Sequence, residues 1–282
     1  MTAGAWRRQA VQRLRGADNP DAQWDADLLL CEALGCEKGR LRFLLERELP
    51  AEAAARLEEQ LQRRLSGEPL QYILGNTCFM GLVFRCDARA LIPRQDTETL
   101  VEEAIHMLSG RERPRVLDLC CGTGCIGLSI ARYVPGAQLT LSDLSGEALS
   151  LARENAQALG VQARFLQGDL FAPSGEERFD LIACNPPYLT AEDMQALQQE
   201  VRSEPDTALF GGEDGLDFYR RLAAEAGAHL CKGGVLLAEC GMGQASEVAR
   251  LFEAIGETRI TRDLCGVERV VIARAGSTRT YR

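Results

Sequence analysis

The most constraining feature of this 282-residue chain is an alternation of short apolar runs with helical segments, which begins near residue 115. The runs RVLDLC, AQLTLSD, ARFLQGD and FDLIACN read as buried strands, and later strands fit GGVLLAEC, TRITRD and VERVVIAR. Strands that alternate with helices of roughly 10 to 15 residues pair in parallel through right-handed crossovers. The pattern therefore predicts a doubly wound α/β domain, with further helices around residues 216–230 and 244–255.

The first part of the chain has a different pattern. Trp6, Val11 and Leu14 lie at helical spacing, and three more helices are expected over residues 25–34, 41–47 and 51–65. Residues 76–92 change character again, with aromatic and branched residues around Gly81 that favour a short hairpin. The predicted organisation is a small helical domain (1–75), a β-hairpin linker (76–92) and the α/β domain (93–282).

Composition excludes several classes of protein. The chain is 46% hydrophobic and 26% charged, which is typical of a folded globular protein. It has no apolar run near the roughly 20 residues of a membrane helix and no signal-peptide core at its start, so a cytoplasmic location is expected. Its net charge of −9, with arginines spread along the chain, argues against broad contact with nucleic-acid phosphates, although a local basic patch stays possible.

The number and spacing of the cysteines argue against a metal-binding site. There are 11 cysteines, an odd number, with no Cys-x-x-Cys pair and only two histidines to complete a site. We interpret them as reduced, mostly buried thiols that pack as small apolar residues, and we expect no bound metal.

Ligands of open parallel sheets bind beyond the carboxyl ends of the strands, near the point where strand order reverses. Three acidic residues fall at such ends, namely Asp118, Asp143 and Asp169. A glycine-rich turn, Cys120 to Gly124, follows the first strand and would let a ligand approach the backbone, while a carboxylate after the second strand can accept both hydroxyl hydrogens of a ribose. The combination indicates a nucleoside, although a purely structural turn, or Asp143 as a helix cap, would explain single features.

The same turn limits the kind of nucleotide. Its sequence, DLCCGTG, is neither the G-x-G-x-x-G of dinucleotide sites nor a P-loop with Lys followed by Ser or Thr. We therefore expect a ligand without a pyrophosphate.

The fourth strand ends in Asn185, Pro186, Pro187 and Tyr188. Two prolines fix the backbone and remove two amide donors, so carbonyl oxygens stay free to accept, the asparagine side chain adds another acceptor, and the tyrosine offers a flat ring. This set of groups fits a planar NH2 group. The alternative is a proline turn that only ends the strand.

Asn-Pro-Pro-Tyr at this place resembles the S-adenosylmethionine-dependent methyltransferases that act on planar amine or amide nitrogens, DNA adenine methyltransferases included. A finer resemblance, running nearly end to end, is to the peptide chain release factor glutamine methyltransferases. The motifs that carry it are GEPLQYILG (67–75), PRQDTE (93–98), Glu204-Pro205 with Ala208-Leu209, GGEDGL (211–216), and Gly233-Gly234 leading to Glu239.

The resemblance implies a Rossmann-like methyltransferase domain and an N-terminal domain that recognises release factors. It implies a monomer that methylates the glutamine of their Gly-Gly-Gln loop, with S-adenosyl-L-homocysteine as product. It also implies that the glutamine amide is held by the catalytic residues Asn185, Pro186, Pro187 and Tyr188. The cofactor-binding residues implied in the same way are Thr97, Asp118, Cys120, Cys121, Gly122, Thr123, Gly124, Asp143, Asp169, Leu170 and Asn185.

The chain departs from the family pattern at three cysteines. Cys120 and Cys121 replace the usual glycine and the usual Thr or Ser of the cofactor turn, and Cys240 replaces a frequent histidine. Cys120 cannot adopt a positive φ as cheaply as glycine does. The long connection from Leu189 to Asp214, with a short helix expected at 192–201, is interpreted as a loop that shapes the substrate site.

Two other functions fit parts of the pattern. An adenine-amine methyltransferase on DNA or RNA would present the same planar NH2 group from a flipped base, but it needs a cationic surface. A nucleotide-binding scaffold protein without chemistry would share the fold, but erosion of Asn-Pro-Pro-Tyr would then be expected, and the tetrad is intact.

Overall fold

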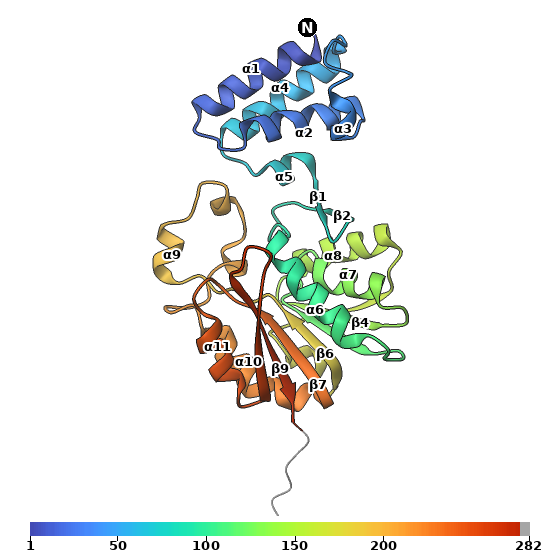
Figure 1. Ribbon diagram of the computed structural model, residues 1–282, viewed down its shortest axis with the longest axis vertical. Coiled ribbons are helices and arrows are strands. Elements are labelled where there is room, and N and C mark those ends of the chain that lie inside the picture. The colour runs from blue at the N-terminus through green and yellow to red at the C-terminus, as the bar shows by residue number, and fades with distance from the viewer. Residues whose placement is uncertain (277–282) are drawn as a thin grey trace, which may run out of the picture. The chain divides into compact units, whose positions relative to one another are not determined.

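The computed structural model describes residues 1–276 (Figure 1). The chain divides into two compact units: residues 1–75 together with 198–203, and residues 76–197 together with those from 204 onward. We refer to them as the helical unit and the catalytic unit. Within the described residues, no helix combines the length and the apolar character that crossing a bilayer requires.

The helical unit packs its helices around one apolar core that includes Trp6, Leu29 and Leu57. Its helices are α1 (Ala3–Gly16), α2 (Ala22–Leu34), α3 (Lys38–Leu41), α4 (Ala51–Leu65) and α5 (Leu70–Leu74). The Thr2 side chain caps α1 by accepting from the Ala5 N–H, and Gly35 ends α2 in the left-handed conformation.

The helix expected over residues 41–47 is wrong, because the chain there forms successive turns after α3. Tertiary hydrogen bonds explain the difference. The first N–H groups of α1 have no partner inside their own helix, and those of Ala3 and Gly4 donate to the carbonyls of Arg47 and Leu45 at 2.9 and 2.7 Å. These carbonyls therefore accept hydrogen bonds from α1 and not from N–H groups of a helix over residues 41–47.

A buried ion pair ties three segments of the helical unit together. Arg64 of α4 donates through Nε to Asp25 of α2 at 2.6 Å, and only 5% and 4% of the two side-chain surfaces are exposed. The same guanidinium donates through Nη2 to Glu200 at 2.6 Å. Residues 198–203 are thereby held in this unit although the segment 76–197 of the catalytic unit separates them from α5 in the sequence.

The hairpin begins the catalytic unit. Strands β1 (Asn76–Phe79) and β2 (Leu82–Arg85) pair antiparallel, and Met80 and Gly81 between them both have positive φ, as a tight two-residue hairpin turn requires. Phe79 and Phe84 are buried in the core of the catalytic unit. The hairpin is also held to that unit by Asn155, which exchanges hydrogen bonds with the Arg85 backbone.

A seven-stranded sheet forms the centre of the catalytic unit, in the order β5-β4-β3-β6-β7-β9-β8 (Figure 1). Its strands are β3 (Arg115–Leu119), β4 (Gln138–Asp143), β5 (Ala163–Gln167), β6 (Phe179–Cys184), β7 (Leu230–Glu239), β8 (Gly256–Arg262) and β9 (Glu268–Ala275). The first five run parallel, and β9 pairs antiparallel with both β7 and β8. The doubly wound, Rossmann-like prediction is confirmed.

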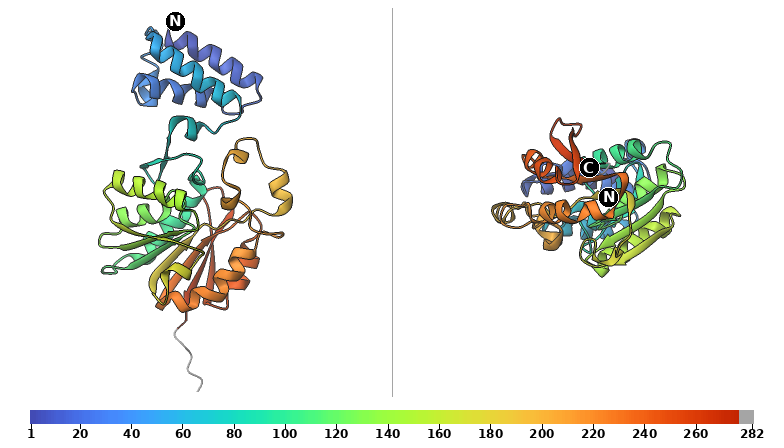
Figure 2. Two further views of the ribbon diagram at one scale, coloured as in Figure 1. Left: turned by 180° about the vertical axis from the view of Figure 1, so that it is seen from behind. Right: turned by 90° about the horizontal axis from the view of Figure 1, so that it is seen from below.

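Helices cover both faces of the sheet, as the views in Figure 2 show. One core contains residues of α6 (Glu98–Leu108), α7 (Cys125–Tyr133) and α8 (Gly146–Leu159), and the other contains residues of α10 (Asp217–His229) and α11 (Ala245–Phe252). Alternate strand residues face the two cores, so that Val116 belongs to the first and Leu117 to the second.

Strand order reverses between β3 and β6. From β3 the chain proceeds outward through β4 and β5, and it then returns to place β6 on the other side of β3. The cofactor turn follows β3 and Asn-Pro-Pro-Tyr follows β6, so both leave the sheet where α/β folds bind ligands.

The buried ion pair generates a stability prediction. Replacing Arg64 with alanine leaves the Asp25 carboxylate buried, with Asn19 as its remaining side-chain hydrogen-bond donor among the described residues, so we expect the free energy of unfolding to fall by about 3 kcal/mol. Arg13→Ala, which breaks the exposed pair with Glu58, is the control and should cost less than about 1 kcal/mol. Urea unfolding of the full chain measures both, and equal losses would contradict the assignment.

Candidate active site

The cofactor turn adopts the conformation that its glycines predict, and one cysteine shares it. Cys120, Gly122 and Gly124 all have positive φ, of 54°, 53° and 78°. Gly124 is the N-cap of α7, and the Cys121 N–H donates to the Ser142 carbonyl at 3.1 Å. Cys120 thus adopts the strained conformation that the sequence analysis identified as costly for a residue with a Cβ atom.

Asp143 supports this turn from the end of β4. One carboxylate oxygen accepts from the Gly122 N–H at 2.8 Å, and the other accepts from the Ser145 N–H at 2.9 Å. Burial raises the pKa of Asp143, and these backbone hydrogen bonds oppose the rise. The cap of α8 is Ser145, whose hydroxyl accepts from Ala148, so helix capping does not account for the Asp143 side chain.

Asp118 lies beneath the turn. It is completely buried, one oxygen accepts from the Gly127 N–H at 2.8 Å, and the other has no hydrogen-bond partner among the described residues. Burial raises the pKa of Asp118 to about 8, and the nearby Asp143 adds to the rise. A Cβ atom on Gly127 would lie 2.9 Å from the Asp118 Cβ, so a glycine is needed for α7 to pack this closely.

The third predicted acid lies in a more open place. Asp169 is exposed and forms an ion pair with Arg221 of α10 at 2.8 Å, whereas the next residue, Leu170, is buried with a positive φ of 43°. Their contact with an adenine stays a prediction from the resemblance.

The Asn-Pro-Pro-Tyr segment is covered by the glycine motif that follows the long loop. Built Cβ atoms on Gly211 and Gly215 would lie 2.7 Å from the Pro187 carbonyl oxygen and 2.3 Å from the Tyr188 carbonyl oxygen. Gly215 also has a positive φ of 73°. These two positions therefore require glycine, which explains in steric terms why GGEDGL accompanies the tetrad.

Asn185 takes part in a small polar network at the end of β6. Its Nδ2 atom donates to the hydroxyl of buried Thr97 at 3.4 Å, and the carboxylate of Glu239 forms side-chain hydrogen bonds with both residues. Burial raises the pKa of Glu239 to about 7, while hydrogen bonds from Thr97 and Asn185 and the charge of Arg269 oppose the rise.

Glu239 is the residue that the sequence analysis missed as part of the site, since it used this position only as a motif marker. It ends β7, and Cys184 of β6 is in register with Ala238 of β7, so Asn185 and Glu239 emerge side by side. Inspection of the fifth parallel strand for a terminal acid, as for the first three, would have found it.

The long loop after Tyr188 is anchored at two places in the catalytic unit. Leu189 exchanges backbone hydrogen bonds with Leu209 and Gly211, and buried Glu204 accepts from the Ile92 N–H at 2.9 Å and pairs with Arg94. The helix expected at 192–201 is shorter, since α9 spans Ala191–Gln195 and a 3₁₀ turn follows at Val201–Ser203. Thr190 is the N-cap of α9 and forms a capping box with Asp193.

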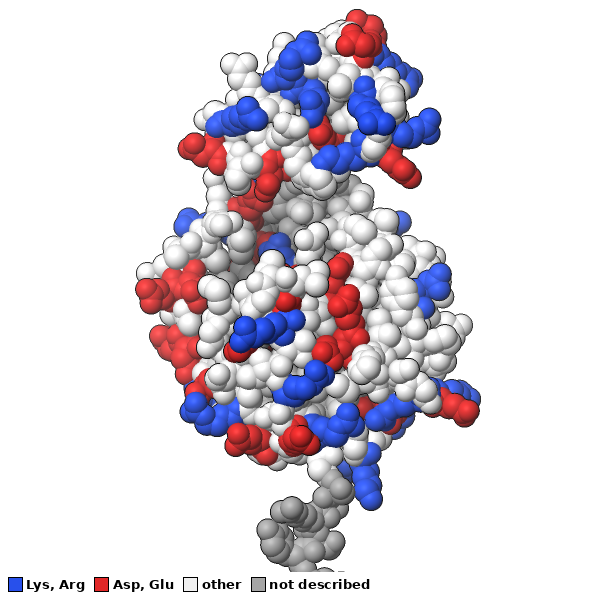
Figure 3. Space-filling model, viewed as in Figure 1, with Lys and Arg blue, Asp and Glu red and all other residues white. Residues whose placement is uncertain are grey.

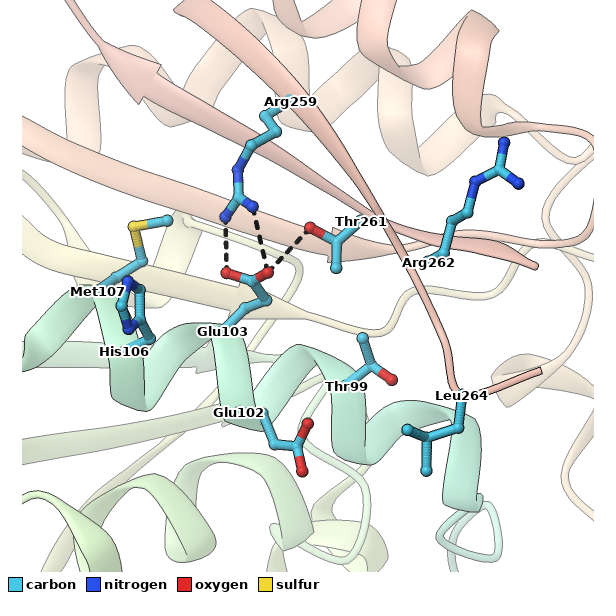
Figure 4. Close-up of a pocket in the computed structure, with 9 residues that line it drawn as sticks. All are labelled: Thr99, Glu102, Glu103, His106, Met107, Arg259, Thr261, Arg262 and Leu264. Atoms are coloured by element: carbon cyan, nitrogen blue, oxygen red, sulfur yellow. Dashed lines mark hydrogen bonds and ion pairs between the residues drawn. The ribbon is translucent and has the colours of Figure 1, made fainter. Parts of the chain in front are cut away.

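A hollow elsewhere on the catalytic unit contains none of these residues. It is lined by Thr99, Glu102, Glu103, His106, Met107, Arg259, Thr261, Arg262 and Leu264 (Figure 4). Glu103 is held there by Arg259 and Thr261, so these three polar side chains already satisfy one another. We therefore assign the site to the strand ends.

The structure shows the state of the cysteines and the distribution of charge on one face. The cysteines at all eleven positions are free thiols, six of them buried, and no cluster of metal-ligating side chains occurs among the described residues. On the face shown in Figure 3, acidic and basic side chains of the catalytic unit are intermixed.

The fold and the strand-end site define a Rossmann-like methyltransferase, and comparison with known proteins agrees. The model of the PrmC N-terminal domain matches residues 5–75, and that of the methyltransferase small domain matches residues 96–213. A 16S rRNA N2 G1207 methyltransferase from Thermus thermophilus, solved with AdoMet and guanosine, shares the fold, with a TM-score of 0.52 and 21% identity over 71% of this chain and 49% of that one.

Relatives are similar over nearly the whole chain. A release factor glutamine methyltransferase of Deinococcus radiodurans is 44% identical over 94% of this chain and 96% of its own length. A release factor glutamine methyltransferase of Geobacter sulfurreducens is 41% identical over 93% of this chain and 92% of its own length. The chain belongs to the release factor glutamine methyltransferase family.

The strained turn generates a prediction with a matched pair of variants. Cys120→Gly and Cys120→Ala both remove the thiol, but only alanine keeps a Cβ atom at positive φ. We expect the glycine variant to be more stable to urea by about 0.5 to 1 kcal/mol, because relief of the strain exceeds the extra entropy of an unfolded glycine. An alanine variant at least as stable as the glycine variant would contradict the strain.

Proposed function

We propose that this protein transfers a methyl group from S-adenosyl-L-methionine to the side-chain amide nitrogen of the glutamine in the Gly-Gly-Gln motif of peptide chain release factors. The single observation that carries the chemistry is the position of Asn185. It lies at the strand-order reversal, one strand away from the glycine turn, with its side chain in a polar network rather than in solvent.

The residues of the turn fit an adenosyl cofactor. Gly122 presents backbone without a side chain, and the Asp143 carboxylate accepts backbone hydrogens at both oxygens and keeps lone-pair capacity for a ribose hydroxyl. Asp118 would support the turn from below, and when bound, S-adenosyl-L-methionine supplies an electrophilic methyl carbon. The remaining residues that would complete this surface are Thr97, Cys120, Cys121, Thr123 and Gly124.

The chain's own residues would act mainly by orientation. An amide nitrogen is a poor nucleophile because its lone pair is delocalised into the carbonyl. Acceptance of its two hydrogens, by the Asn185 side-chain oxygen and the Pro186 carbonyl, would direct the lone pair and stabilise positive charge that develops on nitrogen. The nitrogen oriented in this way would accept the methyl group, S-adenosyl-L-homocysteine would leave, and the nitrogen would then lose one proton to water.

Tyr188 would pack against the flat amide. Its backbone is fixed, because its carbonyl accepts from the Gln244 side chain at 3.0 Å and the two glycines described above lie against the segment. Burial raises the pKa of Tyr188 well above its ordinary value, so its hydroxyl is neutral and cannot serve as a base. The long loop, 189–214, would shape the substrate side of the site.

Membership of the family supports the remaining features of the proposal. We propose that the helical unit recognises the release factor, that the enzyme acts as a monomer, and that it works in the cytoplasm. The 11 basic and 12 acidic residues within positions 1–75 leave this unit without the positive excess that nucleic-acid binding requires.

The proposal is tested with labelled S-adenosylmethionine and three substrates. We expect label on a release factor, none on its Gly-Gly-Gln to Gly-Gly-Ala variant, and none on DNA or RNA. Transfer to nucleic acid would support the adenine-amine alternative, and binding of cofactor without transfer to any substrate would support a scaffold role.

Two variants should separate cofactor binding from chemistry. For Asn185→Ala we expect single-turnover transfer at saturating cofactor to fall by roughly 100-fold with little change in cofactor affinity, because orientation of the amide is lost. For Asp143→Ala we expect cofactor affinity to fall first, by about tenfold or more, because ribose acceptors are lost. Calorimetry and rapid-quench assays measure the two quantities, and unchanged cofactor affinity in Asp143→Ala would refute the ribose assignment.

A further inference from the structure

The network at Asn185 consists of groups whose hydrogen-bonding roles are limited. An ionised carboxylate only accepts, a side-chain amide nitrogen only donates, and a threonine hydroxyl donates one hydrogen while it accepts others. Asn185 Nδ2 donates to the Thr97 hydroxyl, and Glu239 forms hydrogen bonds with both side chains. One arrangement accounts for these contacts: both Nδ2 hydrogens are used, one toward Thr97 and one toward Glu239, and the Thr97 hydrogen points to Glu239.

We propose that Glu239 is a positioning residue that fixes which way the Asn185 amide faces, so that the Asn185 Oδ1 atom is left free to accept an N–H of the substrate carboxamide. The inference rests on the proposed function and adds a residue to its mechanism. Glu239 itself acts only through Asn185.

The opposite orientation of Asn185 is excluded by charge. Rotation of the amide by 180° would place Oδ1 against the Glu239 carboxylate, so that two acceptors would face each other in a buried place, and Nδ2 would face the substrate amide hydrogens. The flipped Asn185 would then offer a donor where the reaction needs an acceptor. A carboxylate at position 239 discriminates between the two orientations, and a neutral amide does not.

A purely structural role does not explain Glu239. The side chain is 1% exposed, and its Oε2 atom has no hydrogen-bond partner among the described residues. An incompletely satisfied buried carboxylate destabilises a fold, and neutral or apolar residues of similar volume are usually at least as stable. The unfavourable burial of Glu239 is explained if its negative charge acts on Asn185, at the end of the adjacent strand.

Protonation of Glu239 would weaken the discrimination. A protonated carboxyl carries a donor and can satisfy Asn185 Oδ1, so both amide orientations become acceptable. Burial raises the pKa values of the tyrosines and cysteines that interact with Glu239, so they stay neutral near neutral pH. Arg269, which also interacts with Glu239, stays cationic. The titratable and charged groups that interact electrostatically with Glu239 from the surrounding elements are Asp96, Cys125, Tyr188, Tyr219, Cys240 and Arg269.

The test is Glu239→Gln, which keeps the volume and removes the charge. At saturating cofactor and release factor we expect kcat to fall by about twofold or more, since the introduced amide accepts either orientation of Asn185 and leaves only part of the enzyme with Oδ1 toward the substrate. Cofactor affinity by calorimetry should stay within about twofold, and the melting temperature should not fall. Glu103→Gln, which changes a glutamate held by an arginine and a threonine in the hollow of Figure 4, is the matched control and should keep wild-type kcat.

The pH profile provides a readout that folding defects do not imitate. Wild-type kcat should decline as pH falls through about 7, where Glu239 gains its proton, and Glu239→Gln should lack this acid limb. A kcat of Glu239→Gln equal to that of the wild type would overturn the inference. So would a pH profile of the wild-type kcat that is flat from about pH 8 to about pH 6. Failure of the wild type to methylate release factors would refute the proposed function instead, so the two failures are distinguishable.

Discussion

Parallel pairing of β6 with β3 on one side and with β7 on the other is the constraint on which the site depends. Leu119 is in register with Cys184, and Cys184 with Ala238, so the residues that follow these strands emerge at one edge of the sheet. The glycine turn, Asn185 and Glu239 thereby come together although 65 and 54 positions separate Cys120 from Asn185 and Asn185 from Glu239 (185 − 120 and 239 − 185). Each further contact of the site refines a position that this pairing has already set.

Buried carboxylates destabilise the fold at this edge of the sheet. Burial raises the pKa of Asp118, Asp143 and Glu239 alike, and two of the three keep an oxygen atom without a partner among the described residues. Backbone N–H groups of Gly122 and Gly127 offset part of the cost for the two aspartates. Strand ends that were optimised for stability alone would carry apolar or neutral residues, so the acids indicate selection for what they hold in place.

The glycine motif 211–216 illustrates a different kind of requirement. It contributes close approach rather than chemistry, because Cβ atoms at Gly211 and Gly215 would collide with the backbone of Pro187 and Tyr188. The rigid tetrad is therefore held from two sides, by its own prolines and by a loop that returns to cover it. This arrangement fits a reaction in which most of the rate comes from orientation of a weak nucleophile.

Most of the catalytic unit was determined by the sequence alone. Strand and helix order, the glycine turn and the Asn-Pro-Pro-Tyr tetrad are local patterns, and local patterns report burial and hydrogen bonding within a segment. Only the tertiary structure decided that β7 lies beside β6 and brings Glu239 to Asn185, and that residues 198–203 join the helical unit through Glu200. Residues 41–47 were predicted wrongly for the same reason: their carbonyls bond to α1, and such non-local partners leave no trace in the periodicity of the segment itself.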